Sequence, residues 1–221
     1  MGDTIVDLFF SQNGSSLAAR ITSYEAGVPV RFIEVDPTTQ RTSDGRDYRE
    51  ISPLGLVPAL RLDDGFLLTE GAALLQHLAT SSNTSNLVPL SSLDLQNLHQ
   101  WLDMAGTAIN EAISSCLFDQ KIFAGTAMHT REFVISSLDF LNVLLTERQY
   151  LLHHFSIADA YLCSLLILST RSRIDFSQWP GIDAYYDRLL KRPSVARAMT
   201  EERVQAAPHR LTSELSVPVL A

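Results

Sequence analysis

The chain has 221 residues and is 46% hydrophobic, which is enough for one domain or two small ones with a sizeable core. Its 17 basic and 25 acidic residues give a formal net charge of −8 and a pI near 5.2. Because the acidic residues are scattered and no basic stripe occurs, we expect neither nucleic acid nor a membrane as a partner.

The start of the chain carries an acid at Asp3, where a secretory signal would have positive residues. No apolar run reaches the ~18 residues that a membrane span needs. The cysteines, Cys116 and Cys163, lie in helix-like segments without the paired spacing of a zinc or redox motif. We therefore predict buried thiols, no metal site and a cytoplasmic protein.

The first eighty residues alternate strand-like and helix-like patterns. Strands are predicted at 5–10, 30–35, 59–62 and 66–68, and helices at 17–27 and 70–79. The polar stretch from Asp36 to Arg49 has no clear period. This order, βαβ followed by ββα, predicts a small mixed sheet with helices on its faces.

The stretch SPLGLVPAL, residues 52–60, places Pro58 at the start of a predicted strand. Proline has no N–H to give to a sheet, and the residues around it are strand-like rather than typical of a turn. A cis Val57–Pro58 bond would turn the peptide groups of Val57 away from the sheet. The sequence thus suggests that a ligand uses these groups.

The stretch TSSNTSNLVPLSS, residues 80–92, is rich in Ser, Thr and Asn and is typical of an interdomain linker. Beyond it, apolar residues recur at helical spacing. These stripes run from Leu98 to Cys116, Val134 to Leu145, Ile157 to Leu168 and Ile182 to Leu189. We therefore predict an α/β domain at 1–80, a linker at 81–92 and an all-α domain at 93–221.

The stretch FSIADAYL, residues 155–162, carries a variant of the capping box. Ser156 is predicted to accept from the N–H of Asp159, whose carboxylate accepts from the N–H of Ser156. This pair is expected to start a core helix and to matter for folding.

The order of these elements resembles the cytosolic glutathione transferases over nearly the whole chain. SPLGLVPAL resembles their cis-proline loop, LLTEGAALLQHLA the segment that binds the γ-glutamyl end of glutathione, and FSIADAYL their buried capping box. Residues 179–199, WPGIDAYYDRLLKRPSVARAM, are similar to the C-terminal helices of bacterial members, especially the beta class. The resemblance implies a thioredoxin-like N-terminal domain, an all-helical C-terminal domain and a homodimer.

The resemblance also implies a binding site for glutathione. The cysteinyl backbone of glutathione would pair with Val57, beside Pro58. Its γ-glutamyl carboxylate would lie at the N-terminus of the helix that begins at Glu70 and Gly71, and Glu70 would pair with its ammonium group. Ordinary helix initiation is the alternative role of Glu70 and Gly71.

The catalytic residue implied by the family is a donor that stabilises the glutathione thiolate near the start of the first helix. Phe9 and Phe10, at the end of the first strand, have no such group. Alignment with the beta class places Ser15 where those enzymes carry a cysteine, with Ser16 beside it, and Asn13 is a rival donor. All three residues could instead cap the first helix.

The electrophile site implied by the family lies between the sheet domain and the helix from about Leu95 to Phe118. Phe10, Asn110 and Glu111 are the predicted contacts. Beta-class members carry a His-Lys pair where this chain has Asn110 and Glu111, so that positive charge is lost.

The resemblance therefore implies an enzyme that activates glutathione, as co-substrate, for attack on a small hydrophobic electrophile, as in detoxification. Two alternatives stay open at this point. One is a glutathione-dependent isomerase, cyclase or lyase in a biosynthetic or catabolic pathway. The other is a non-catalytic binding protein on the same fold.

Overall fold

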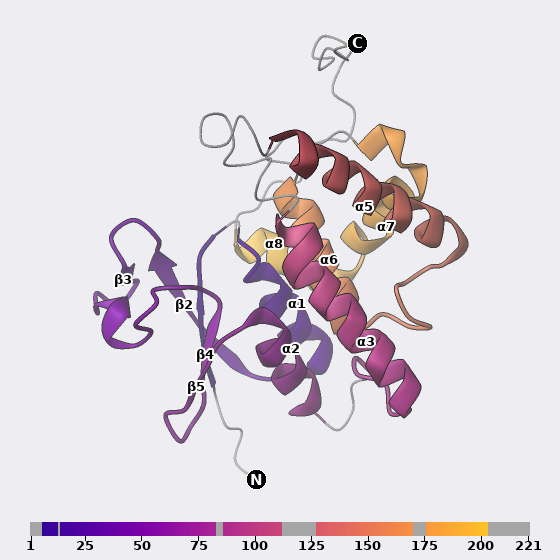
Figure 1. The fold of residues 1–221 in the computed structure, drawn as a ribbon. Helices are drawn as coiled ribbons and strands as arrows, with labels where there is room; N and C mark the ends of the chain where they lie inside the picture. The colour runs from indigo at the N-terminus through magenta and orange to yellow at the C-terminus, as the bar shows by residue number, and fades with distance from the viewer. Residues whose placement is uncertain (1–5, 13, 83–85, 112–126, 170–175, 203–221) are drawn as a thin grey trace.

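The computed structural model describes residues 6–12, 14–82, 86–111, 127–169 and 176–202. A sheet with two helices on one face forms the N-terminal part, and a group of helices packs beside those two helices (Figure 1). The N-terminal part is thioredoxin-like, as predicted, and the C-terminal part is helical. The domain boundaries themselves stay a prediction. Cys116 lies outside the described residues.

The sheet is mixed and has the strand order β3-β2-β1-β4-β5. Its strands are β1 (Val6–Phe10), β2 (Val30–Asp36), β3 (Arg41–Thr42), β4 (Ala59–Arg61) and β5 (Leu67–Leu68). The β1–β2 pair is parallel, and the other three pairs are antiparallel. The strand β3 and the 3-10 helix η1 (Tyr48–Glu50) lie in the polar stretch where the sequence indicated no element.

Each face of the sheet has its own core because side chains alternate along β1. Leu8 packs with the helices α1 (Leu17–Ala26) and α2 (Gly71–Thr80). Phe9 points to the other face and packs against Tyr48 of η1. The helix α1 ends as predicted at Gly27, whose φ of 67° suits a residue without a side chain.

A buried carboxylate joins the three central strands. Asp7 of β1 lies opposite Arg31 of β2 and Arg61 of β4 in the strand register. The Asp7 oxygens accept from Arg31 at 2.6 and 2.8 Å and from Arg61 at 2.6 and 3.2 Å. Burial alone would raise the pKa of Asp7, but the bonds and charges of Arg31 and Arg61 hold it below its usual value.

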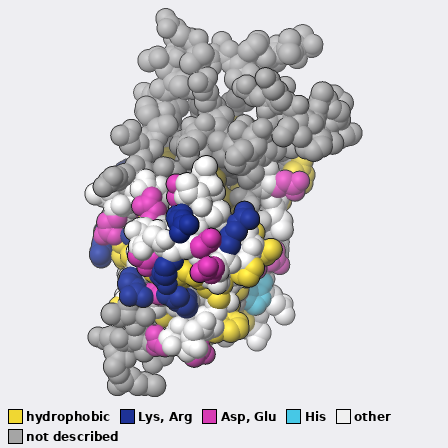
Figure 2. Space-filling view, turned by 90° about the vertical axis from the view of Figure 1, so that its left-hand side faces the viewer, with side chains coloured by type: hydrophobic (Ala, Val, Ile, Leu, Met, Phe, Trp, Pro, Cys, Tyr) yellow, Lys and Arg dark blue, Asp and Glu magenta, His cyan; other side chains and the backbone are white. Residues whose placement is uncertain are grey.

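The surface at the β3 side of the sheet carries both signs of charge. Figure 2 shows basic and acidic side chains next to each other on this face. One such pair is Arg46 with Asp44, at 2.6 Å. The view therefore shows interspersed charges rather than a continuous basic surface on this side of the described residues.

The helical part is built around one buried helix, α6 (Ile157–Ser169). It contacts α3 (Ser92–Met104) and α7 (Pro180–Leu190). Against α7 pack α5 (Ala127–Glu147), η4 (Phe176–Gln178) and α8 (Pro193–Glu201). Of the helices in the described ranges, none has the length and apolar character needed to cross a membrane.

The first helix of this part is less regular than predicted. After α3 the backbone continues as the π-helical segment η2 (Ala105–Ile109) and returns to α-helix at Asn110 and Glu111. The sequence predicted an uninterrupted α-helix, and its apolar stripe carries no signal for a wider turn. Such segments occur mostly as single turns within α-helices, often at functional sites.

The capping box forms, with one half different from the prediction. The Asp159 carboxylate accepts from the N–H of Ser156 at 2.8 Å, as predicted. The Ser156 hydroxyl, however, donates to that carboxylate at 2.8 Å instead of accepting from the N–H of Asp159. The other Asp159 oxygen accepts from the N–H of Leu151 and the hydroxyl of Tyr185. A buried carboxylate needs hydrogen-bond donors, and the Ser156 hydroxyl therefore donates to Asp159 instead of accepting from the main chain.

We predict that Asp159→Ala destabilises the fold strongly, because three buried donors besides the Ser156 hydroxyl lose their acceptor. The expected loss in free energy of unfolding is about 3 kcal/mol or more, measured by urea unfolding. Asp94→Ala is the matched control, since Ser91 and Asp94 form a similar but exposed box at the start of α3. Asp94→Ala should lower the free energy of unfolding by about 1 kcal/mol or less. Equal losses in the two variants would contradict the role given to burial.

We also predict that Asp7→Asn removes part of the pH dependence of stability. The pKa of Asp7 is lowered in the folded state, so its contribution is present above the unfolded pKa and is lost as pH falls through the folded value. The variant should lose about 1 kcal/mol near pH 7 and nothing at pH 2. Unfolding curves at both pH values test this, with Asp63→Asn, at an exposed turn residue, as the control. An equal loss at both pH values would contradict the ion-pair explanation.

Candidate active site

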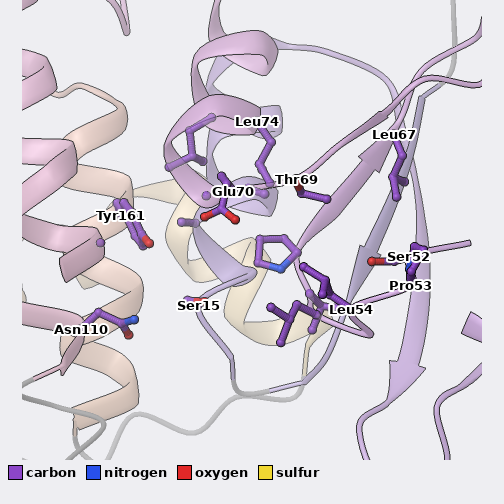
Figure 3. A pocket seen from close by; sticks show the side chains of 18 residues that line it. Ser15, Ser52, Pro53, Leu54, Leu67, Thr69, Glu70, Leu74, Asn110 and Tyr161 are labelled. Atoms are coloured by element: carbon purple, nitrogen blue, oxygen red, sulfur yellow. The ribbon is translucent and has the colours of Figure 1, made fainter. Parts of the chain in front are cut away.

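A pocket of about 420 Å³ lies where the sheet, α2 and the helical part meet. The predicted residues Ser15, Val57, Pro58, Glu70, Gly71 and Asn110 all line it. Figure 3 shows Tyr161 and Asn110 on one side of this pocket and Leu54, Pro53 and Leu67 on the other, with Glu70 and Ser15 between them. Most of the residues singled out from the sequence are thus brought to one place.

The peptide groups of Val57 are left open to the pocket. The Val57–Pro58 bond is cis, as predicted, and ladder pairing with β1 starts only at Ala59. In the described part of the chain, neither the N–H nor the C=O of Val57 bonds to another main-chain group. An extended peptide ligand can therefore pair with Val57 as an added strand.

Glu70 marks the start of α2 with an unusual backbone. Its φ of 67° is in the left-handed region, which costs a non-glycine residue of order 1 to 3 kcal/mol and is often found at functional sites. Its C=O accepts from the N–H of Leu74 at 3.1 Å, but its side chain makes no capping bond in the described structure. The first N–H groups of α2 and the Glu70 carboxylate thus both remain available to a ligand.

The start of α1 distinguishes the two predicted serines. Ser15 lines the pocket, and its hydroxyl bonds to no other described residue. Ser16 is buried, and its hydroxyl donates to the C=O of Ser11 at 3.0 Å. Ser16 is the N-cap residue of α1 without a side-chain capping bond. Ser15 is therefore placed for a ligand, whereas Ser16 is not. Asn13 lies outside the described residues.

Two of the predicted electrophile contacts do not reach the pocket. Phe10 is 7% exposed and packs edge-on against Phe32, below the Arg20 guanidinium. Arg20 in turn pairs with Glu202 at 2.8 Å, which joins α1 to the end of α8. Glu111 is exposed, one residue beyond Asn110, and does not line the pocket. Of the three, Asn110 alone lines the pocket.

Tyr161 lines the pocket and lies within the apolar stripe predicted from Ile157 to Leu168. Its ring packs so close to Gly71 and Gly106 that a Cβ there would lie 3.0 and 3.3 Å from its hydroxyl. Burial, and then the charge of Glu70, raises the pKa of Tyr161, so the phenol keeps its proton and can donate. The sequence signal for a role of Tyr161 in the pocket was its hydroxyl within an apolar stripe, because a buried tyrosine usually finds a polar partner.

Comparison with known proteins identifies the family. Residues 15–81 match the model for the N-terminal domain of glutathione S-transferase. The chain is 32% identical over 197 residues to the glutathione S-transferase GstA of Escherichia coli O157:H7. The aligned region covers 88% of this chain and 98% of that protein.

Two solved structures extend this similarity to the whole fold. A ternary complex of BphK, a bacterial GST, has a TM-score of 0.84 at 32% identity over 89% of this chain and 99% of that one. A sphingomonad glutathione S-transferase complexed with glutathione has a TM-score of 0.83 at 32% identity over 90% of this chain and 100% of that one. With the cis-proline loop, the free start of α2 and the helical part all in place, the chain belongs to the glutathione S-transferase family.

Proposed function

We propose that this protein is a transferase that binds glutathione and activates its thiol for attack on a small hydrophobic electrophile. The observation that carries the proposal is that a single pocket holds the free peptide groups of Val57, the uncapped start of α2 and the Ser15 hydroxyl. Each of these fits a different part of glutathione.

The α-carboxylate and the ammonium group of the γ-glutamyl residue suit the start of α2. The α-carboxylate of glutathione accepts from the first N–H groups of the helix, where the dipole favours an anion. The Glu70 carboxylate pairs with the ammonium group, and the Tyr161 hydroxyl donates to the ligand from the side of the helical part. The cysteinyl backbone then lies along Val57, as an extra strand.

This placement directs the sulfur toward the start of α1, where the Ser15 hydroxyl is free to donate. The thiol loses its proton to solvent, and the donor and the helix end stabilise the resulting thiolate. A sulfur lone pair then forms the new carbon–sulfur bond, and the electrons of the broken bond leave with the leaving group. Asn110 faces the same space and is the proposed contact of the electrophile.

A homodimer and a cytoplasmic location are part of this proposal. The helix α5 exposes the large apolar side chains of Phe133, Phe140 and Val143, which a partner subunit would cover. Cys163 is a free, buried thiol, as expected of a protein in a reducing compartment.

We predict that Ser15→Ala raises the pKa of the bound thiol. In the parent protein, bound glutathione should titrate below the ~8.5 of a free thiol, as followed by thiolate absorbance against pH. In the variant, the pKa of the bound thiol should be higher, and conjugation should be about ten- to a hundredfold slower. Ser16→Ala is the matched control and should leave the titration unchanged, because its hydroxyl is bonded to Ser11.

A bound thiol that titrates like free glutathione in the parent protein would overturn the proposal. Mass analysis of the products decides among the chemistries, since conjugation yields a stable thioether. Glutathione that returns unchanged beside a rearranged or eliminated product would instead indicate an isomerase or lyase.

We predict that Tyr161→Phe weakens glutathione binding about fivefold, the effect of one lost hydrogen bond, without lowering thermal stability. Calorimetric titration with glutathione measures this. Tyr150→Phe removes a hydroxyl that bonds Arg192 outside the pocket, and it should leave the affinity unchanged. Unchanged affinity in Tyr161→Phe would show that Tyr161 acts only in packing.

A further inference from the structure

The end of the pocket away from α2 is walled by apolar side chains. Beyond Val57 the lining includes Pro53, Leu54 and Leu56, with Leu67 of β5 and one polar residue, Ser52, beside them. Figure 3 shows Leu54, Pro53 and Leu67 on the side opposite Tyr161. Leu54 is 77% exposed and Leu56 is 64% exposed, so both side chains are open to whatever occupies this end.

The loop that carries these leucines is held in place by the protein. The N–H of Ser52 donates to the C=O of Tyr48, and the N–H of Gly55 donates to the C=O of Ser52, both at 2.8 Å. The Tyr48 hydroxyl donates to the C=O of Leu56 at 2.8 Å. Gly55 has a φ of 66° and packs against the Gln40 side chain. The apolar wall is therefore a fixed feature of the pocket rim.

The charges that line the pocket lie at its other end. Glu70 is the one carboxylate, and among the described residues that line the pocket none is Lys, Arg or His. The positive end of α2 is next to Glu70 and serves the γ-glutamyl group. A second carboxylate, bound beyond Val57, would meet leucine side chains and no cation of the described lining.

Glutathione has such a second carboxylate, on its glycyl residue. If its γ-glutamyl group lies at α2 and its cysteinyl group at Val57, as in the proposed function on which this inference rests, the glycyl end reaches the wall of Leu54 and Leu56. We propose that this pocket selects γ-glutamylcysteinyl thiols whose C-terminal end is uncharged, such as an ester or an amide, over glutathione itself. An uncharged end loses less hydration, and alkyl carbons gain contact with the leucines.

Calorimetric titration of the parent protein with two probes tests this proposal. The probes are glutathione and its glycyl monoethyl ester, which differ only at the C-terminal carboxylate. The ester should bind about threefold more tightly or better, the effect of partly burying its two added carbons. Equal affinities, or tighter binding of glutathione, would overturn the inference and leave the proposed function standing. If neither probe binds, both the inference and the proposed function are wrong.

A charge introduced into the wall gives a second test. Leu54→Lys and Leu56→Lys should each strengthen binding of glutathione and reverse the preference for the ester. Leu90→Lys is the matched control, because Leu90 is fully exposed and does not line the pocket, and it should leave the preference unchanged. A preference that stays the same in all three variants would show that the wall does not contact the C-terminal end.

Discussion

The position of α6 depends on the carboxylate of Asp159. Four donors converge on this buried group: two N–H groups from the preceding turn, the Ser156 hydroxyl and the Tyr185 hydroxyl of α7. The network fixes where α6 begins and how it is rotated. Since α6 contacts α1, α2, α3 and α7, an error at its first turn would displace the interface between the sheet part and the helical part. A buried carboxylate outside the pocket lining thus supports the geometry of the site.

Tyr161 connects the position of α6 to the pocket. It lies two residues after Asp159, and its hydroxyl reaches Gly71 at the start of α2 and Gly106 in the π-helical segment. Side chains at either glycine would crowd the ring, so the absence of a Cβ allows α2 and the first helix of the helical part to approach it. The pocket therefore lies where two parts of the chain pack closely against the Tyr161 ring.

The sequence predicted the elements that depend on local chemistry. The cis bond at Pro58, the end of α1 at Gly27 and the carboxylate half of the capping box follow from what those residues can and cannot do locally. It could not distinguish Ser15 from Ser16, because adjacent residues near a helix start point about 100° apart and only the packed backbone says which faces the pocket. The packing of Gly106 of the π-helical segment against Tyr161, and of Phe10 against Phe32 and Arg20, joins different elements and has no local signal in the sequence.

The distribution of charge in the pocket indicates which groups would bind glutathione and which would stabilise its thiolate. In the proposed complex, backbone groups hold the ligand at Val57 and at α2, and such groups cannot be removed by substituting a side chain. With Asn110 neutral and Glu111 outside the lining, no side-chain cation of the described pocket lining is left to hold a thiolate. Stabilisation then rests on dipoles, the Ser15 hydroxyl and the start of α1, which act at short range. A site of this kind favours an electrophile that is itself uncharged, because neither its leaving group nor its substituents would find a positive side chain to bind.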